Sequence, residues 1–150
     1  MKHEELLDEV MDRCAAMKTL SAARTITRRF DEAIRSTGLT ITQFTLLIAI
    51  GKARPTSIAQ IGTYLSLDRS SVTRNLKPLE AAGLVTRGPE GEKRMRQVLL
   101  THAGKAKLKE AYPLWKRAQD AVEAALSDSF YTATMRGVTK LSSIGRLDQK

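Results

Sequence analysis

The segment from Thr56 to Thr101 constrains the fold of this 150-residue chain more than any other part. It reads TSIAQIGTYLSLDRSSVTRNLKPLEAAGLVTRGPEGEKRMRQVLLT. Its pattern predicts a short helix, a tight turn, a second helix, and two short strands over residues 84–87 and 97–100. This order is a helix-turn-helix followed by a β-hairpin wing, which is typical of proteins that read double-stranded DNA.

Capping signals predict where the two helices of this segment begin and end. Ser57 opens the Ser-x-x-Gln pattern of a capping box, and Asp68 stands where its carboxylate can accept from the first N–H groups of a helix over residues 69–82. Gly83 can supply the left-handed residue that ends this helix. Pro78 lies inside it, and we expect a bend there rather than a stop, because the apolar stripe continues beyond it.

The helix over residues 69–82 has two chemically distinct faces. Three apolar residues fall on the side expected to meet a core: Val72, Leu76 and Leu79. On the other side, short hydroxyls precede two cations, of which Arg74 can pair with a guanine edge and Lys77 can meet a phosphate. Such a stripe also fits a plain solvated surface, but its place after a short capped helix favours DNA reading. The residues expected to contact DNA are Ser57, Arg69, Ser70, Ser71, Thr73, Arg74, Lys77, Lys93, Arg94 and Arg96.

The turn of the wing joins turn-forming residues to a basic cluster in the sequence GPEGEKRMR, residues 88–96. A hairpin tip that carries Lys93 or Arg94 can enter a minor groove, where narrow A·T-rich segments concentrate negative potential. Glu92 suits this place only when it pairs with an arginine and fixes the shape of the wing. The alternative is a solvent-exposed hairpin with no DNA contact.

The charge of the chain is concentrated where a polyanionic partner requires it. The formal net charge is +9 and the pI is near 10.0. Residues 54–105 hold nine basic side chains against four acidic ones, whereas residues 1–20 hold three against five. The basic excess therefore coincides with the predicted DNA-reading segment. Aromatic residues are only 5% of the chain, which argues against the base-stacking platforms of single-strand binders.

Amphipathic helices are expected on both sides of this segment. Apolar residues recur at helical spacing over residues 5–37 and predict one long helix there. Thr40 then begins a short helix through a capping box with Gln43, and its apolar face is formed by Phe44, Leu47, Ile48 and Gly51. After the wing, one helix should run from Thr101 to about residue 126 and a last one from Ser127 to about residue 147. Pro113 should kink or divide the first of these.

The terminal helices carry more apolar side chains than a core of this size can cover. These residues are expected to form a dimer interface: Leu6, Leu7, Val10, Leu126, Phe130, Met135, Val138 and Leu141. Two-fold pairing would bury them and set two reading helices about one DNA turn, roughly 34 Å, apart. The expected target is therefore a pseudo-palindromic DNA site.

The chain resembles the MarR family of winged helix-turn-helix regulators over nearly its full length. The matching pieces are GLTITQFTLLIAI, SIAQIGTYLSLDRSSVTRNLKPLEAAGLV and VLLTHAGK. The resemblance implies a mainly α fold with a small β-wing, in which residues 38–101 bind DNA and long helices in residues 1–37 and 102–150 dimerise as parts of a single domain. The family's wing usually contains Asp-x-Arg; here Glu92-Lys93-Arg94 takes that place, so Arg94 matches the minor-groove arginine beside a longer acid.

The resemblance also implies a small-molecule effector in a cleft between the dimerisation and DNA-binding parts. An aromatic or anionic ligand would release a repressor from DNA. The candidate lining residues are Phe30, Phe44, Leu47 and Trp115, with Arg24 or Arg28 receiving an anionic group. Some relatives sense oxidants through a cysteine in the first helix, where Cys14 lies. This helix lacks the tyrosines that accompany such sensors, so a structural cysteine is favoured over a redox-sensing one.

Other classes of protein are less consistent with the sequence. His3 and His102 are far apart, and no phosphate loop or catalytic triad stands out, so neither an enzyme nor a cofactor is expected. A single cysteine excludes a disulfide framework or a multi-cysteine metal site within one chain. No apolar window is long enough to span a bilayer and the acidic start does not resemble a signal peptide, so we expect a cytoplasmic protein without a membrane partner. The remaining rival is a winged helix that contacts proteins or coats DNA without regard to sequence.

Overall fold

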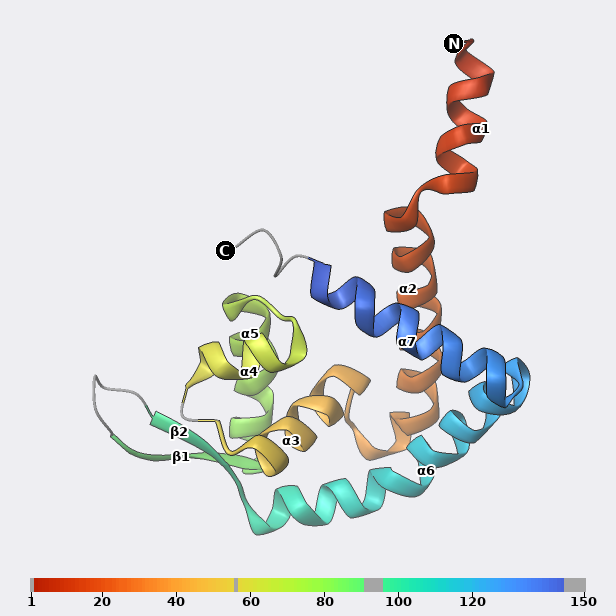
Figure 1. Cartoon of the computed structure of the whole chain (residues 1–150). Helices are drawn as coiled ribbons and strands as arrows, with labels where there is room; N and C mark the ends of the chain where they lie inside the picture. The colour runs from red at the N-terminus through yellow and green to blue at the C-terminus, as the bar shows by residue number, and fades with distance from the viewer. Residues whose placement is uncertain (1, 56, 91–95, 145–150) are drawn as a thin grey trace.

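The computed structural model describes residues 2–55, 57–90 and 96–144. Within these residues seven α-helices, one 3₁₀ helix and two strands follow one another. They are α1 (His3–Arg13), α2 (Ala15–Ile34), η1 (Arg35–Thr37), α3 (Ile41–Ala53), α4 (Ile58–Leu65), α5 (Arg69–Ala81), β1 (Val85–Glu90), β2 (Arg96–Leu100), α6 (His102–Leu126) and α7 (Asp128–Ile144). The mainly α fold with a small β-wing is therefore confirmed. In Figure 1, α3, α4, α5 and the β1–β2 hairpin form one lobe, and α1 extends away from it.

The core lies in this lobe, where α3, α4 and α5 pack against the hairpin and the ends of α2 and α6. Nine large side chains are almost completely buried there: Ile34, Leu46, Leu47, Ile50, Ile61, Val72, Leu76, Leu79 and Val98. Ile58 and Leu65 of α4 are partly buried against them. By contrast, α1 and α7 contain no buried residue along the lengths described. A single chain therefore builds its core almost entirely in the lobe.

The predicted single helix over residues 5–37 is wrong, because the chain breaks at Cys14. This residue has an extended backbone (φ −68°, ψ 103°), and it closes α1 by donating its N–H to the Val10 carbonyl at 3.0 Å. Its Sγ also accepts the Met17 N–H at 3.4 Å, so that Cys14 caps α2. Since α1 buries no residue, no tertiary packing forces it to continue the axis of α2.

The capping box at the start of α3 is confirmed in both directions. Thr40 Oγ1 accepts the Gln43 N–H at 3.2 Å, and Gln43 Oε1 accepts the Thr40 N–H at 3.0 Å. The expected buried face of α3 is only partly right. Phe44 and Leu47 are buried, but Ile48 is 46% exposed. Neighbours on α2, α4, α5, α6 and β2 surround this helix, so they bury a broader face than one helical stripe.

Neither internal proline divides its helix. α5 continues through Pro78 to Ala81, as expected. α6 likewise remains one helix from His102 to Leu126 across Pro113, although it changes direction along its length (Figure 1). Thr101 caps it as predicted, because Thr101 Oγ1 accepts the Gly104 N–H at 3.0 Å.

Candidate nucleic-acid interface

The turn between α4 and α5 is a tight one that brings the two helices together in the lobe. Ser57 caps α4 as predicted, with its Oγ accepting the Gln60 N–H at 3.2 Å. Ser66 ends α4 in the left-handed region (φ 55°), and the Leu67 N–H returns to the Gly62 carbonyl at 2.9 Å. A Cβ on Gly62 would lie 2.6 Å from the Leu67 carbonyl oxygen, which is too close for any side chain. Glycine at this position therefore permits the tight helix-turn-helix.

The two predicted faces of α5 are present in the structure. Val72, Leu76 and Leu79 are at most 2% exposed and face the core. The exposed side carries the cations and hydroxyls expected to meet DNA: Arg69, Ser70, Thr73, Arg74 and Lys77. Ser71 is half-buried beside them. The lobe thus presents one polar, cationic helix face to solvent while it anchors the opposite face.

Asp68 organises the first turn of α5 beyond the cap expected from the sequence. Its Oδ1 accepts the Ser71 N–H at 2.8 Å and the Ser70 hydroxyl at 2.5 Å, and its Oδ2 accepts the Ser71 hydroxyl at 2.6 Å. The Ser70 hydroxyl, followed by the Ser71 hydroxyl and N–H, holds the Asp68 pKa well below its ordinary value. Asp68 is therefore ionised at neutral pH, with its charge directed at the helix N-terminus.

Further contacts connect the stripe residues to one another. Arg74 Nη2 donates to Ser71 Oγ over a long distance of 3.5 Å. Thr73 Oγ1 donates to the Arg69 carbonyl at 2.9 Å, and Asn75 Nδ2 donates to the Ser71 carbonyl at 2.9 Å. The sequence reasoning treated the hydroxyls as independent DNA contacts, whereas the structure shows that their protons are bonded within the helix.

Contacts at the base of the wing attach it to α5 and to two neighbouring turns of the lobe. An ion pair joins the Arg87 guanidinium on β1 to the Glu80 carboxylate on α5. Thr101 Oγ1 donates to the carbonyl of Gly83 at 2.7 Å, and Gln97 Nε2 donates to that of Arg54 at 3.2 Å. Sequence reasoning missed the ion pair. The sequence offers one sign of it, because Glu80 and Arg87 carry opposite charges on either side of the Gly83 turn.

The strands of the wing pair as an antiparallel hairpin with an irregular register. Val85 faces Leu100 and Arg87 faces Val98, but the register shifts before Glu90 meets Arg96. The predicted tip residues Glu92, Lys93 and Arg94 lie outside the described residues, and so does the side chain of Arg96. Their minor-groove role stays a prediction.

The predicted effector residues fall into two separate groups. Phe30, Phe44 and Leu47 belong to the buried core, and Trp115 stacks on Phe44 with ring centroids 6.2 Å apart. The two arginines lie instead on the exposed side of α2, in a groove whose lining residues are Leu20, Ser21, Ala23, Arg24, Thr25, Thr27 and Arg28. The structure does not bring the aromatic and cationic groups together in that groove, so the effector site stays a prediction.

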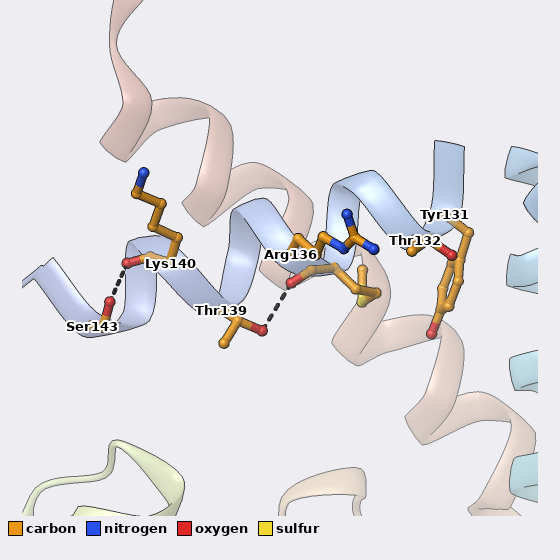
Figure 2. Close-up of a pocket in the computed structure, with 7 residues that line it drawn as sticks. Tyr131, Thr132, Arg136, Thr139, Lys140 and Ser143 are labelled. Atoms are coloured by element: carbon orange, nitrogen blue, oxygen red, sulfur yellow. Dashed lines mark hydrogen bonds between the residues drawn. The ribbon is translucent and has the colours of Figure 1, made fainter. Parts of the chain in front are cut away.

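A second groove runs along α7, among residues expected to dimerise. Figure 2 shows the side chains that line it: Tyr131, Thr132, Met135, Arg136, Thr139, Lys140 and Ser143. The hydroxyls of Thr139 and Ser143 bond back to the carbonyls of Met135 and Lys140 at 2.9 and 2.7 Å. Two cations, Arg136 and Lys140, line this groove beside the apolar side chain of Met135. The residues expected to form the dimer interface are exposed on the single chain, except for Leu126, which is half-buried. The exposed ones are Leu6, Leu7 and Val10 on α1 and Phe130, Met135, Val138 and Leu141 on α7.

The described residues offer few other kinds of candidate site. No cluster of three or more His, Cys, Asp or Glu side chains that could hold a metal ion occurs in residues 2–55, 57–90 and 96–144. In the same part of the chain no single helix is long and apolar enough to cross a bilayer, although the bent pair Ala15–Thr37 and Ile41–Ala53 meets that test when taken together. Cys14 is a half-buried free thiol at the α1–α2 break.

The helix-turn-helix, the hairpin that follows it and the exposed cationic face of α5 define a winged helix-turn-helix protein. A family model described as MarR family matches residues 37–94. The HTH-type transcriptional regulator SarZ of Staphylococcus saprophyticus is 30% identical over 99 residues, which cover 65% of this chain and 68% of SarZ. The chain therefore belongs to the MarR family.

Two further comparisons place the chain among transcriptional regulators. An uncharacterized HTH-type transcriptional regulator of Bacillus subtilis, YwoH, is 32% identical over 89 residues, which cover 59% of this chain and 65% of YwoH, slightly less than two thirds of its length. The crystal structure of the M. tuberculosis regulator MosR in complex with DNA matches with a TM-score of 0.81 and 29% identity, over 92% of this chain and 100% of MosR. These relatives are regulators of transcription rather than enzymes, in agreement with the sequence-based expectation.

Proposed function

We propose that the chain is a transcriptional regulator that reads a pseudo-palindromic double-stranded DNA site as a homodimer. The observation that carries this proposal is the division of α5 into a buried face (Val72, Leu76 and Leu79) and an exposed face with Arg74 and Lys77. A helix held in this way can enter a major groove without disturbing the core. The fold shared with MosR, which was solved with DNA, supports the same role.

The terminal helices support the homodimer. α1 and α7 expose their apolar stripes, with Leu7 and Val10 each 48% and Phe130 60% exposed. α1 also carries five acidic side chains against one arginine, whereas Arg136 and Lys140 line the groove along α7. Opposite charges beside apolar stripes make these helices suitable surfaces for each other in a two-fold assembly.

In this proposal the dimer helices also control the DNA-binding state. A small aromatic or anionic ligand that binds one spacing of the two α5 helices more tightly must shift DNA affinity by linkage. We propose that such a ligand releases a repressor from its DNA site. Titration of DNA binding against a panel of aromatic acids tests this part, and an unchanged affinity across the panel would contradict it.

The test of DNA reading is the selection of bound fragments from a random double-stranded pool, followed by affinity measurements on the enriched site. Single base-pair changes should cost about 1–3 kcal/mol each. Arg74→Ala should relax the base preference at one position of each half-site, since an arginine that pairs with guanine carries sequence information. Lys77→Ala should weaken binding evenly across sequences and reduce the salt dependence, because a phosphate contact carries charge but no sequence information.

The two variants serve as controls for each other, since they remove similar charge from the same exposed face. Equal effects of both on every sequence would contradict the assigned roles. A steep salt dependence without sequence preference would instead indicate an architectural DNA-coating protein. No DNA binding at all would leave protein contact as the function of the winged helix.

A further inference from the structure

Three hydroxyl groups on α5 have their protons committed within the protein. Ser70 and Ser71 donate to the two carboxylate oxygens of Asp68 at 2.5 and 2.6 Å, and Thr73 donates to the Arg69 carbonyl at 2.9 Å. A hydroxyl has one donor proton and two acceptor lone pairs. While these bonds are kept, each of the three groups offers only an acceptor to any partner outside the helix.

The two serines are held more firmly than the threonine. Hydrogen bonds to an ionised carboxylate are roughly twice as strong as bonds between neutral groups. Asp68 is itself fixed, because its Oδ1 also accepts the Ser71 backbone N–H at 2.8 Å as the helix cap. The bond from Thr73 to a helix carbonyl is of the ordinary, exchangeable kind. Ser70 is the exposed member of the serine pair and Ser71 is half-buried, so Ser70 is the serine that a partner can reach more readily.

Ser71 extends the network to the cationic part of the stripe. Its Oγ donates to Asp68 and accepts a hydrogen bond from Arg74 Nη2 at 3.5 Å. These two bonds form a chain from Arg74 through Ser71 to Asp68. One N–H of the guanidinium is thereby turned towards the start of the helix, and the others remain available as donors. Beyond Arg69, the exposed face of α5 thus presents acceptors first, at Ser70 and Thr73, and then donors, at Arg74 and Lys77.

On the basis of the proposed DNA-binding function, we propose that Asp68 helps to set the base specificity of α5 by holding the Ser70 hydroxyl as a hydrogen-bond acceptor. An acceptor here matches the exocyclic amino group of adenine or cytosine in the major groove. It does not match phosphate oxygens, the N7 and O6 atoms of guanine or the O4 atom of thymine, which are themselves acceptors. Each half-site should therefore place an adenine or cytosine amino group at Ser70, while Arg74 meets the acceptors of a guanine.

In this arrangement Asp68 is a positioning residue and does not touch DNA. Asp68→Gly separates its two roles, because glycine is also tolerated at the N-cap position of a helix. Glycine has no side-chain oxygen, however. It cannot accept either serine proton, so the polarity of the Ser70 hydroxyl is no longer fixed.

The experiment uses the full chain and the site enriched from a random double-stranded pool. In each half-site, adenines are replaced by purine and cytosines by 2-pyrimidinone, one position at a time, so that only the amino group is lost. For the wild type, one position should lose about three- to tenfold in affinity, as expected for a single neutral hydrogen bond. Ser70→Ala and Asp68→Gly should bind the natural and the substituted site equally at that position. Pool selection with Asp68→Gly should also tolerate guanine or thymine there.

Controls separate specificity from folding and from the proposed function. Ser142→Ala removes an exposed serine from α7 and should keep the wild-type response, and circular dichroism should show unchanged helix content in all variants. If Ser70→Ala keeps the loss, the assignment to Ser70 is overturned; if Asp68→Gly keeps it, the role of Asp68 is overturned. A pool that yields no enriched sequence overturns the proposed function as well, whereas an enriched site without a Ser70-dependent amino group overturns only this inference.

Discussion

The lobe and the terminal helices use similar apolar residues in opposite ways. In the lobe, Leu46, Leu47 and Leu76 are completely buried. On the terminal helices, Leu7 is 48% and Leu141 is 43% exposed. This difference shows that the lobe buries its apolar residues within one chain, whereas the terminal helices leave theirs exposed on the single chain. The stability of the lobe should therefore not depend on protein concentration, whereas that of the terminal helices should depend on association.

The largest expected effect comes from the core of the lobe. Leu76→Ala should lower the free energy of unfolding by about 2–5 kcal/mol, because it removes a buried side chain and leaves a cavity. Leu141→Ala is the matched control at an exposed site. Urea unfolding at several protein concentrations separates the two: Leu76→Ala should cost the same at each, while the effect of Leu141→Ala should depend on concentration. Equal, concentration-independent losses would contradict the comparison.

An intermediate effect is expected at the terminal helices. Leu7→Asp should weaken the proposed dimer roughly tenfold or more, since burying a leucine contributes about 1.5–3 kcal/mol that a charge cannot supply. Analytical ultracentrifugation over a micromolar range measures the change. Asp12→Asn, on the polar face of the same helix, serves as the control and should alter association much less. A wild type that sediments as a monomer at micromolar concentration would contradict the dimer itself.

The smallest effect is expected from the cap of α5 as pH falls. The folded-state pKa of Asp68 is depressed below its unfolded value, mainly by the Ser70 hydroxyl, so the cap stabilises the helix above the unfolded pKa of about 3.9. That contribution is lost only as pH falls from about 4 towards the folded pKa. NMR titration should therefore show the Ser71 amide unchanged between about pH 8 and pH 5, at any protein concentration. A transition near neutral pH would contradict the ionised cap.

Local sequence signals predicted much of the lobe. The caps at Thr40, Ser57, Asp68 and Thr101 were all found, because each depends on a side chain and a backbone N–H only a few residues apart. The two faces of α5 were also correct, since helical periodicity alone separates Val72, Leu76 and Leu79 from the exposed stripe.

Other features depended on contacts that a helical pattern cannot show. The break at Cys14 interrupts a stripe that continues at helical spacing, and Ile48 lies outside a buried surface that several elements define together. The aromatic and cationic residues expected in one effector cleft were grouped by chemistry, whereas packing placed Phe44 in the core and Arg24 on an exposed helix side.

The sequence by itself determined the order of the elements, their caps and the polar face of α5, because these follow from interactions within a few residues. Only the tertiary structure decided the burial of α3 by several elements and the pairing of Arg87 with Glu80, since these join residues of different elements. The break between α1 and α2 and the direction in which each α5 hydroxyl proton points are local too, but more than one local arrangement fits the same sequence. In the sequence, Ser70 and Arg74 belong to one polar stripe. In the structure, the Asp68 carboxylate takes the Ser70 proton, so that Ser70 offers an acceptor where Arg74 offers donors.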